Sequence, residues 1–576
     1  MRISKDTDVS EYIVFDNASL EKLLQTLNKK VNTNFGSGFA LIVDKNGKLV
    51  GTVEDSDLRK FLSKSSKKVP LISEIMRKDF VSVENGLNQA EIIENIIQQM
   101  SSRGWNTTLP VKLIPILAEG KPTGLLDVEE INQAIQQIKN KHVVIGLGYV
   151  GLTLALSLAQ LGRTVHGYDK DDLRINSLKG GKSYILEPGI ENLLKQNIGS
   201  NFIAKNEIES MVNEPGIRNI YFICVGTPLD QNKKPYLDLI WESTEELLKV
   251  LKKGDAIVMR STVPIGTGRN VIRKIETELG WQVGVDFHYI SAPERTVEGN
   301  ALRELRELPQ IIAGATETCH ILGLSIFRNL ANSVTSLNEI EGAELVKLMG
   351  NAFRDYNFAF SNYFIDTCQE YNLDINSLIE ASNKGYPRSQ IPLPSPGVGG
   401  PCLTKDSYFL QSSHSIEAPS PIINARRINE LVPEKMVRFL ERVIEGLSEL
   451  ECLAIGMAFK GVPETNDFRN SPSVDFINAL KKKVKAINIW DSALGKENIK
   501  LDFENDSADK EYDFFAILNN NPKNVDFLYE RIKSNTKQTL VLLDPWRLIT
   551  PSHLLFTSGT RKIHYVTLSF HELFEI

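Results

Sequence analysis

The segment 142–169 constrains the fold of this chain more than any other part of the sequence. A short apolar strand runs into Gly146-Leu-Gly148-Tyr149-Val150-Gly151, an amphipathic helix follows, and a second strand ends at Asp169. Glycines at this spacing between a strand and a helix permit a tight turn, close approach of a pyrophosphate to the backbone, and close helix–strand packing. The segment therefore predicts a βαβ unit that binds a dinucleotide. A glycine-rich turn without a ligand is the alternative.

Asp169 indicates which dinucleotide to expect. It stands at the end of the second strand, where a carboxylate can accept a hydrogen bond from the 2′-hydroxyl of a ribose. The same carboxylate would repel the 2′-phosphate of NADP. The expected cofactor is therefore NAD.

Apolar strands and helices go on alternating beyond this unit, which predicts an α/β fold with parallel, doubly wound sheets. A long helical stretch over 339–371 separates two such regions, and the Pro- and Gly-rich segment 385–401 must be a loop. We expect two Rossmann-like doubly wound domains joined by this long-helix connector. Further strands are expected at 220–225, 256–259, 453–456, 487–490, 514–518 and 540–544.

Residues 1–138 carry a different pattern, which occurs twice. The first copy gives strand, turn, strand and helix over 39–62, and the second gives the same order over 113–138, with a turn at 119–122. Gly51 and Gly124 stand at equivalent points. Two copies of one pattern predict a tandem α+β module before the dinucleotide-binding unit.

Length and composition bound the class of protein. At roughly 100–200 residues per domain, 576 residues suggest several domains. The 66 Lys and Arg against 72 Asp and Glu give a net charge of −6, which provides no field for holding nucleic acid or an anionic membrane. The start lacks the apolar core of a signal peptide, and no apolar run approaches the ~20 residues that span a bilayer. We expect a cytoplasmic protein.

One cysteine stands in a context that suggests reactivity. Cys402 lies in Pro396-Gly-Val-Gly-Gly-Pro-Cys402-Leu-Thr-Lys405-Asp406, where the glycines would let the backbone and a bulky substrate approach closely. Lys405 offers a cation, which would lower the pKa of the thiol. Five cysteines are too few, and odd in number, for a disulfide framework. The others, predicted to be small buried hydrophobic residues, are Cys224, Cys319, Cys368 and Cys452.

Further polar residues stand where the predicted fold gathers functional groups. Lys347 and Asn351 are four residues apart and share one face of the long helix, with Glu344 beside them. A solvated helix face is the alternative. Glu294 and Thr262 each follow an apolar strand, and sites of α/β proteins form at strand ends.

Seven motifs occur in order along about residues 140–570. They are the glycine motif with Asp169, Val225-Gly-Thr227-Pro228, Ser261-Thr262-Val-Pro264, Ala292-Pro-Glu294-Arg295, Leu345-Val-Lys347 with Asn351, Gly399-Gly-Pro-Cys402 with Asp406, and Gly456-Met-Ala-Phe-Lys460 followed by Asp467-Phe-Arg469-Asn-Ser471-Pro472. This set resembles the UDP-glucose/GDP-mannose dehydrogenase family, the nucleotide-sugar 6-dehydrogenases. The resemblance implies an NAD-binding domain over 139–335, a helical central and dimerisation domain with the cysteine loop over 336–445, and a nucleotide-sugar-binding domain over 446–576.

The family oxidises the C6 alcohol of a nucleotide-bound hexose to a carboxylate with two NAD, and the resemblance implies the roles of matching residues. Cys402 would hold the aldehyde as a thiohemiacetal and then as a thioester. Lys347 would stabilise negative charge on the C6 oxygen, and Asn351 would help to position it.

The resemblance also implies which residues serve hydrolysis of the thioester. Asp406 would assist proton transfer and the hydrolytic water, while Glu294 and Thr262 would orient or activate that water. No metal ion is expected in this chemistry.

Other matching positions are implied to bind cofactor or substrate. Those for NAD are Gly146, Gly148, Tyr149, Val150, Gly151, Asp169, Arg174, Thr227, Thr262, Glu298, Lys405 and Arg469. Those for the UDP-sugar are Glu294, Lys347, Asn351, Arg388, Gly399 and Lys460. Arg388 resembles an arginine that enters the substrate site of the neighbouring subunit, which implies a homodimer or a larger homo-oligomer.

The motifs divide on the identity of the sugar. Tyr386-Pro-Arg388 and Pro293-Glu-Arg295-Thr resemble members that act on UDP-N-acetylhexosamines, whereas Cys402-Leu-Thr-Lys-Asp406 looks more like the UDP-glucose and GDP-mannose members. Both sugars stay open, with the N-acetylhexosamine favoured, and the base is open between uridine and guanosine. The acid product would supply surface polysaccharide synthesis.

Two other functions compete with this interpretation. One is a two-electron dehydrogenase or reductase that stops at the aldehyde or uses another alcohol, and the other is a catalytically idle nucleotide-sugar sensor. Simple hydride transfer needs no thiol, so Cys402 together with Lys347 and Asn351 argues against the first. The complete catalytic set argues against the second.

Residues 1–138 lie outside that family and resemble a pair of cystathionine-β-synthase (CBS) repeats, chiefly through the segment from Gly51 to Leu58. Such pairs often hold adenine nucleotides, with a carboxylate on the ribose. Asp57 and Glu130 occupy that place in the two repeats, whereas Glu54 stands where Thr or Ser is common. The resemblance implies a regulatory adenine-nucleotide site, and a packing module without a ligand is the alternative.

Overall fold

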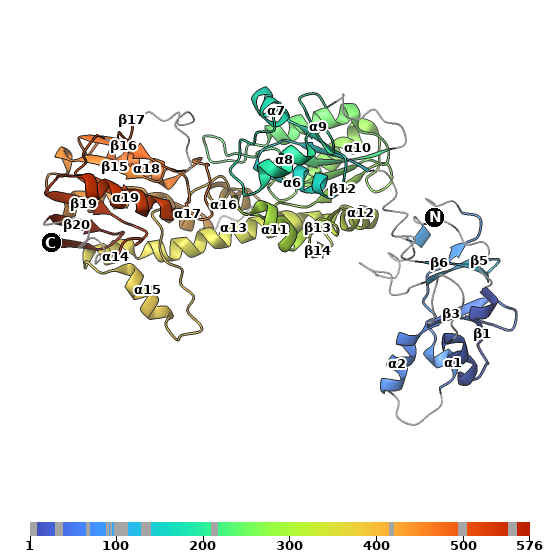
Figure 1. The fold of residues 1–576 in the computed structure, drawn as a ribbon. Helices are drawn as coiled ribbons and strands as arrows, with labels where there is room; N and C mark the ends of the chain where they lie inside the picture. The colour runs from blue at the N-terminus through green and yellow to red at the C-terminus, as the bar shows by residue number, and fades with distance from the viewer. Residues whose placement is uncertain are drawn as a thin grey trace. The chain divides into compact units, whose positions relative to one another are not determined.

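The computed structural model describes residues 9–28, 38–64, 70–87, 92, 95–96, 99, 113–127, 140–208, 217–413, 420–492, 504–507, 509–550 and 561–575. The chain divides into two compact units (Figure 1). The smaller unit comprises Met1–Asn140, Gly216–Arg218 and Thr316–Ser325, and the larger unit comprises the remainder. None of the helices in these described ranges is long and apolar enough to cross a membrane.

The smaller unit contains two three-stranded sheets of the same topology. In the first, β2 pairs in parallel with β1 and antiparallel with β3; in the second, β5 pairs in parallel with β4 and antiparallel with β6. The elements are η1 (Val9–Tyr12), β1 (Ile13–Phe15), α1 (Leu20–Asn28), β2 (Phe39–Val43), β3 (Leu49–Glu54), α2 (Asp55–Lys64), α3 (Ile72–Ile75), β4 (Val83–Glu84), β5 (Leu113–Ala118) and β6 (Lys121–Asp127).

The two hairpins also share an irregularity. The register shifts after Ile42 in the first and after Ile116 in the second, and these residues pair with Gly51 and Gly124. The predicted tandem repeat and the equivalence of the two glycines are therefore confirmed. The predicted helix 128–138, with Glu130, lies outside the described residues.

The turn of the second hairpin is shorter than the predicted 119–122. Only Glu119 and Gly120 form it, with φ of 51° and 79°, and β6 begins at Lys121. Positive φ at both turn residues matches the right-handed twist of the flanking strands, so the hairpin closes on two residues. Pro122 consequently lies in the strand.

The first α/β domain is a doubly wound sheet of order β14-β13-β12-β11-β10-β7-β8-β9, and it belongs to the larger unit apart from Asn140, Arg218 and Thr316–Ser325. Adjacent strands are parallel around β8 and β11, whereas β13 runs antiparallel to β12. The chain crosses from β9 to β10 on the other side of β7, so the turn after β7 lies at a switch point. The elements are β7 (Asn140–Ile145), α6 (Tyr149–Gln160), β8 (Val165–Tyr168), α7 (Asp172–Lys179), α8 (Ile190–Asn197), β9 (Phe202–Lys205), β10 (Arg218–Ile223), α9 (Asp238–Val250), β11 (Ala256–Met259), α10 (Thr267–Leu279), β12 (His288–Ser291), α11 (Ala301–Glu307), β13 (Gln310–Gly314), α12 (Glu317–Phe327) and β14 (Val334–Leu337).

Helices connect this domain to the next. Figure 1 shows α13 as one long helix between the two α/β domains, with α15 projecting away. The predicted stretch 339–371 is interrupted at Phe364. The helix runs through Gly342 and Gly350, because a single glycine weakens a helix without ending it. The elements are α13 (Ile340–Tyr363), α14 (Ile365–Glu370), α15 (Ile375–Asn383), α16 (Leu403–Ser412), α17 (Pro421–Val443) and η3 (Leu447–Glu449).

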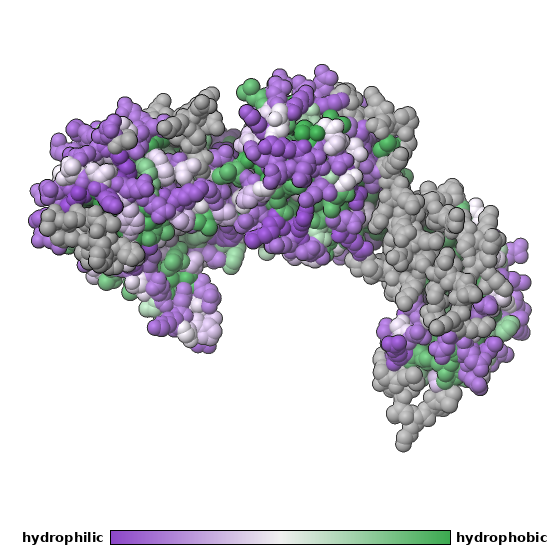
Figure 2. Space-filling model, viewed as in Figure 1, coloured by the Kyte–Doolittle hydropathy of each residue, from purple (hydrophilic) through white to green (hydrophobic). Residues whose placement is uncertain are grey.

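The second α/β domain has the order β17-β16-β15-β18-β19-β20-β21 and is parallel except for the β20–β21 hairpin. Its first strand, β15, again lies between the two halves of the sheet. The elements are β15 (Glu451–Ile455), α18 (Pro472–Leu480), β16 (Ala486–Trp490), β17 (Glu504–Asn505), β18 (Phe514–Ile517), α19 (Pro522–Ser534), β19 (Thr539–Leu543), β20 (Lys562–Val566) and β21 (His571–Glu575). Figure 2 shows that hydrophilic residues cover most of the visible face of both α/β domains.

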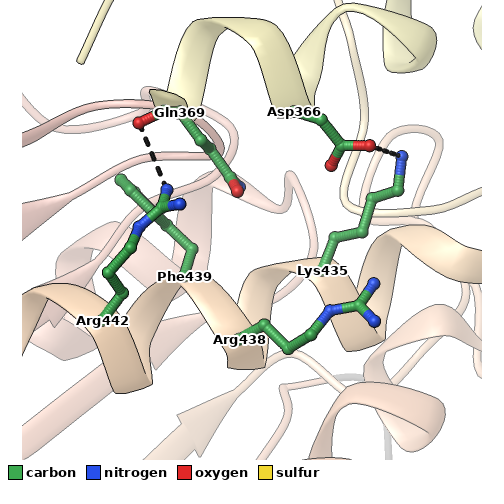
Figure 3. A pocket seen from close by; sticks show the side chains of 6 residues that line it. All are labelled: Asp366, Gln369, Lys435, Arg438, Phe439 and Arg442. Carbon is green, nitrogen blue, oxygen red and sulfur yellow. Dashed lines mark hydrogen bonds and ion pairs between the residues drawn. The ribbon is translucent and has the colours of Figure 1, made fainter. Parts of the chain in front are cut away.

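A cavity of about 330 Å³ lies between α14 and α17 (Figure 3). Its basic side chains mostly have partners: Lys435 forms a 2.7 Å ion pair with Asp366, and Arg442 donates to the Gln369 carbonyl at 3.2 Å. Cations near the carboxyl ends of helices also complement the helix dipoles. We therefore interpret the cavity as a charged junction between two helices, and none of the predicted site residues lines it.

Candidate active site

The glycine-rich turn after β7 leaves the start of α6 open. Gly146 has φ of 87°, and a Cβ there would lie 3.0 Å from the Cys224 carbonyl oxygen. A Cβ on Gly151 would lie 1.8 Å from the Gly146 carbonyl oxygen, whereas a Cβ on Gly148 would meet nothing within 4 Å. Two glycines are thus required by packing, and the third faces open space at a helix N-terminus. This arrangement fits the pyrophosphate of a dinucleotide.

Asp169 lies beside that turn and is largely buried. Its Oδ2 accepts the Leu147 N–H at 2.8 Å, its Oδ1 accepts the Asp171 N–H at 3.0 Å, and Arg174 approaches Oδ2 to 3.4 Å. The carboxylate is therefore fixed where the ribose of a dinucleotide on this turn would lie. Asp169 and Arg174, both predicted for NAD, meet at one place.

The side chain of Tyr149, a residue predicted to bind the cofactor, anchors a loop. Its hydroxyl donates to the Glu187 carboxylate and accepts the Gly299 N–H, and Glu187 also accepts the Leu302 N–H at 3.1 Å. Burial and the bond to Glu187 raise the pKa of Tyr149, so the phenol stays protonated. No motif pointed to Glu187.

Glu294 is a buried carboxylate held by several donors. Arg260 pairs with its Oε2, and the N–H groups of Arg295 and Thr296 donate to its Oε1 at 2.6 and 2.9 Å. Burial opposes ionisation, but Arg260, the two N–H groups and nearby Lys347 outweigh it and lower the pKa of Glu294. An ionised, immobile carboxylate suits orientation of a water molecule. Sequence reasoning missed Arg260, although it directly follows a predicted strand.

Polar side chains link the long helix α13 to α16 and to the first α/β domain. Asn351 donates to Asp406 Oδ2 at 2.6 Å, and Lys405 Nζ lies 2.9 Å from Asp406 Oδ1. Lys405 also reaches Thr227 Oγ1 at 3.4 Å, and Thr227 donates to the Thr262 carbonyl at 2.7 Å. Five predicted site residues are therefore brought together by contact.

Cys402 stands immediately before α16 and is exposed, whereas the other four cysteines are buried. All five are free thiols, as predicted. Desolvation by the surrounding protein has the largest effect on the pKa of Cys402 and raises it. Lys347 and Lys405 lower this pKa and Asp406 raises it, and the net result is a higher pKa than that of a free thiol. Lys405 does lower the pKa of the thiol, as expected, but it and Lys347 do not offset desolvation and the carboxylates of Asp406 and Glu298.

Glu344, predicted to lie beside Lys347, has a structural task. Its two oxygens accept the N–H groups of Gly266 and Gly268 at 2.7 and 2.8 Å, where α10 begins. Burial raises the pKa of Glu344 to about 7 although these bonds oppose it. A carboxylate at a helix N-terminus stabilises the unpaired N–H groups there.

The loop that carries Glu298 contacts the second α/β domain. Lys460 donates to the Glu298 carbonyl at 2.6 Å, Thr465 donates to its carboxylate at 3.1 Å, and Arg469 lies 3.8 Å from it while binding Asp467. Burial, and then Asp467, raise the pKa of Glu298 to about 7. Lys460 and Arg469 of the second α/β domain therefore contact the loop that carries Glu298.

The glycines before Cys402 serve packing between segments of this chain. A Cβ on Gly399 would lie 2.3 Å from Pro472, one on Gly397 would lie 2.8 Å from it, and one on Gly400 would lie 2.7 Å from the Phe459 ring. We expected these glycines to let both the backbone and a bulky substrate approach closely. The close approach of other protein atoms bears out the expected approach of the backbone, and a role of Gly399 toward substrate stays a prediction.

Arg388 is the predicted residue that stays apart. It follows α15 on an exposed segment, where its guanidinium lies 4.8 Å from the centre of the Tyr386 ring and donates to the Tyr386 hydroxyl at 3.1 Å. None of the contacts among the described residues brings Arg388 to Cys402.

The second α/β domain repeats the turn of the first. Gly456 has φ of 94°, and Asp491, at the end of β16, accepts the N–H groups of Met457 and Ala458 at 2.5 and 2.9 Å. Asp169 holds the first turn in the same way. Asp491 was missed, although the strand–glycine–strand–aspartate order that revealed Asp169 was present here too.

In the smaller unit, which resembles CBS repeats, Asp57 forms an internal ion pair. Arg77 Nε lies 2.6 Å from its Oδ1, and its Oδ2 accepts the Glu54 N–H at 2.9 Å. Across the portion of the chain that the structure describes, no group of three or more His, Cys, Asp or Glu side chains could hold a metal ion.

Comparison with known proteins decides the family. Sequence profiles of the UDP-glucose/GDP-mannose dehydrogenase family match in three consecutive parts: the NAD binding domain over 140–331, the central domain over 341–430 and the UDP binding domain over 453–551. The chain belongs to the UDP-glucose/GDP-mannose dehydrogenase family. It is an NAD-dependent oxidoreductase, so the predicted family, fold class, enzyme class and cofactor are confirmed. The CBS domain profile matches residues 8–64.

Individual relatives within this family are similar over most of their length. UDP-N-acetyl-D-mannosamine dehydrogenase of Pyrococcus horikoshii is 32% identical over 403 residues, covering 69% of this chain and 94% of the relative. The Campylobacter jejuni protein of the same name is 31% identical, covering 66% and 95%. The solved structure of UDP-D-ManNAc dehydrogenase from P. horikoshii superposes with a TM-score of 0.66 at 29% identity, covering 74% of this chain and 99% of that one.

Proposed function

We propose that this dehydrogenase oxidises the C6 alcohol of a UDP-N-acetylhexosamine, UDP-N-acetyl-D-mannosamine foremost, to the uronic acid in two oxidation steps. The observation that carries the proposal is the setting of Cys402. It is an exposed thiol within electrostatic reach of Lys347, Lys405 and Asp406, beside two α/β domains with nucleotide-type turns. A dehydrogenase that stopped at the aldehyde would have no use for this thiol.

The first step takes the alcohol to the aldehyde. Lys347, buried on α13, stabilises negative charge on the C6 oxygen, and Asn351 one turn later helps to position that oxygen. Asp406 accepts from Asn351 and fixes the orientation of its amide. NAD supplies the hydride acceptor here and again in the second oxidation.

The second step runs through covalent catalysis. The Cys402 sulfur adds to the aldehyde carbon and gives a thiohemiacetal, which loses a hydride and a proton to become a thioester. The surroundings raise the pKa of Cys402, so the proton leaves as the sulfur attacks, and we assign assistance in this transfer to the Asp406–Lys405 pair, whose charges act on the thiol. Water then cleaves the thioester, with Glu294 orienting it and Thr262 beside it, and the thiol is restored.

The choice of sugar rests on two supports. The relatives named above act on UDP-N-acetyl-D-mannosamine by name, and Tyr386-Pro-Arg388 resembles members that use N-acetylhexosamines. The acid product would be a precursor for surface polysaccharide. Initial rates on UDP-N-acetylmannosamine, UDP-N-acetylglucosamine, UDP-glucose and GDP-mannose test this choice, and a higher kcat/KM for UDP-glucose would overturn it.

Cys402→Ala tests the covalent route. The variant should form no acid yet bind the UDP-sugar within about threefold of wild type, because the thiol contributes chemistry and little contact area. Cys402→Ser is the matched control for size and should behave alike. Acid formation by either variant near the wild-type rate would exclude a thioester.

We also propose that the enzyme is a homodimer through one face of α13. The face is apolar and exposed: 65% of Phe353 and 63% of Tyr363 are accessible, and the further members at helical spacing are Met349, Tyr356 and Phe360. An apolar stripe this long on a soluble helix favours a second copy as its cover. Phe353→Glu with Phe360→Glu should give monomers in light scattering, and Arg388 would then lose its place in the neighbouring site.

For the CBS-like unit we propose regulation by an adenine nucleotide. Asp57 can reach a ribose only by exchanging its bond with Arg77, so binding would rearrange that pair. ATP, ADP and AMP should alter dehydrogenase kinetics, and Asp57→Asn should blunt the effect. If none of the three changes either kinetics or melting temperature, the packing-module alternative holds.

A further inference from the structure

A buried polar network joins the helices of the candidate site, and Asp355 is at its centre. Asp355 lies on α13 two turns beyond Lys347 and one beyond Asn351, and none of it is accessible to solvent. Its Oδ2 accepts from Ser407 of α16 at 3.2 Å. Because Asn351 binds Asp406, two consecutive residues of α16 are held by two consecutive turns of α13.

The other oxygen of Asp355 faces α17. Arg426 Nη1 lies 2.9 Å from Oδ1, and Asn429 donates to the same oxygen and to the Asp355 carbonyl at 2.8 Å. Arg426 is itself fully buried, and its Nη2 donates to the Val398 carbonyl at 2.8 Å. Val398 belongs to the loop that leads into Cys402. The network therefore extends from α13 to the backbone before the thiol.

A second branch holds the same loop at an earlier point. Asn429 Oδ1 accepts from Asn362 of α13 at 2.9 Å, and Asn362 Oδ1 accepts the Ser395 N–H at 3.0 Å. The loop is thus tied to the helices at residues 395 and 398, three residues apart. Both ties lead back to groups that bind Asp355.

We propose that Asp355 is a positioning residue, which sets the register of α13, with Lys347 and Asn351, against α16, which begins after Cys402. Apolar packing alone would hold these helices together with less cost of desolvation, but it would tolerate small shifts along the helix axes. A carboxylate with partners on α16 and α17 is satisfied in one register only. The inference rests on the proposed roles of Cys402, Lys347 and Asn351.

The experiment removes one link and leaves the ion pair with Arg426 in place. Ser407→Ala in the full chain deletes the hydroxyl that joins α16 to Asp355, and Ser407→Thr restores a hydroxyl. Ser361→Ala is the matched control. Ser361, like Ser407, is a fully buried serine, but it lies on α13 and donates to the Pro392 carbonyl at 2.6 Å, outside the network. The readouts are kcat, KM, melting temperature and the rate of Cys402 alkylation by iodoacetamide against pH.

The expected result separates positioning from stability. Ser407→Ala should lower kcat about tenfold with both KM values within about twofold, and should shift the pH profile of alkylation, because small misplacements of reacting groups are costly. Both alanine variants should lower the melting temperature by similar amounts. Ser361→Ala should leave kcat and the alkylation of Cys402 unchanged. Ser407→Thr should recover most of kcat.

Two outcomes would overturn the proposal. One is a Ser407→Ala enzyme with wild-type kcat and alkylation, and the other is an equal loss of kcat in both alanine variants. Asp355→Asn should show a larger defect of the same kind, and if it fails to fold, Ser407→Ala still decides. Alkylation measures the thiol directly, so it tests the positioning even if the wild-type enzyme oxidises none of the UDP-sugars tried, which would be a failure of the proposed function.

Discussion

The choice between NAD and NADP should depend on the charge of Asp169. In the wild type, the Leu147 nitrogen lies 2.8 Å from Asp169 Oδ2. Asp169→Asn keeps the size of the side chain and an acceptor for this N–H, but it removes the negative charge. The wild-type enzyme should prefer NAD strongly, and the variant should lose most of that preference, chiefly through better use of NADP.

The expected magnitude follows from the charges around Asp169. Two unit charges 4 Å apart interact by about 4 kcal/mol at an effective dielectric constant near 20, and a 2′-phosphate carries more than one charge. Arg174, 3.4 Å from the same carboxylate, and salt both reduce the repulsion. A net penalty of about 3 kcal/mol corresponds to roughly a 150-fold preference for NAD, since 1.36 kcal/mol is tenfold in rate.

The assay is kcat/KM for each cofactor at saturating UDP-sugar. Asp171→Asn is the matched control, because Asp171 also binds Arg174, at 3.3 Å, but is more exposed and braces only α7. It should leave the cofactor ratio within about threefold of wild type. The reasoning is refuted if wild type uses NADP as well as NAD, or if Asp169→Asn keeps the full preference.

Three further predictions concern other parts of the enzyme. Glu294→Gln should slow thioester hydrolysis, so that an acyl-enzyme appears in intact mass spectra, and an unaltered hydrolysis rate would contradict this role. The loss of thermal stability in the variant should be full near pH 7 and should shrink as pH falls through the lowered pKa of Glu294 in the wild type. Glu298→Gln should flatten a rise in the KM for NAD between pH 6 and 8. The Glu298 pKa of about 7 makes the carboxylate anionic, and repulsive to the phosphates of the cofactor, only as pH rises; an unchanged profile in the variant would count against it. A chain starting at Asn140 should keep dehydrogenase activity and lose any response to adenine nucleotides, and a retained response would place that site elsewhere.

The sequence predicted most of the fold because its signals are local. The glycine turn, Asp169 and the strand ends at Thr262 and Glu294 follow from spacing within single βαβ units. The prediction was incomplete where distant segments meet. The glycines before Cys402 face Pro472 and Phe459, which lie some 60 or more residues away in the sequence, and no local pattern reveals such contacts.

Sequence reasoning also missed residues whose importance comes from burial. Arg260 and Glu187 hold Glu294 and Tyr149, and Asp355 joins three helices, yet each stands in a stretch that looks ordinary by composition. The net effect on the pKa of Cys402 was likewise out of reach, because it balances two lysines against desolvation. Charge partners were visible in the sequence, whereas the loss of solvent was not.

The number of NADH molecules formed per UDP-N-acetylmannosamine consumed tests the central claim most directly. With limiting sugar and excess NAD, absorbance at the NADH band is compared with the amount of uronic acid found by mass spectrometry. A covalent Cys402 route that completes both oxidations predicts two NADH and one acid per sugar, with no free aldehyde. One NADH per sugar, with aldehyde as the product, would contradict the four-electron mechanism and leave Cys402 without its proposed role.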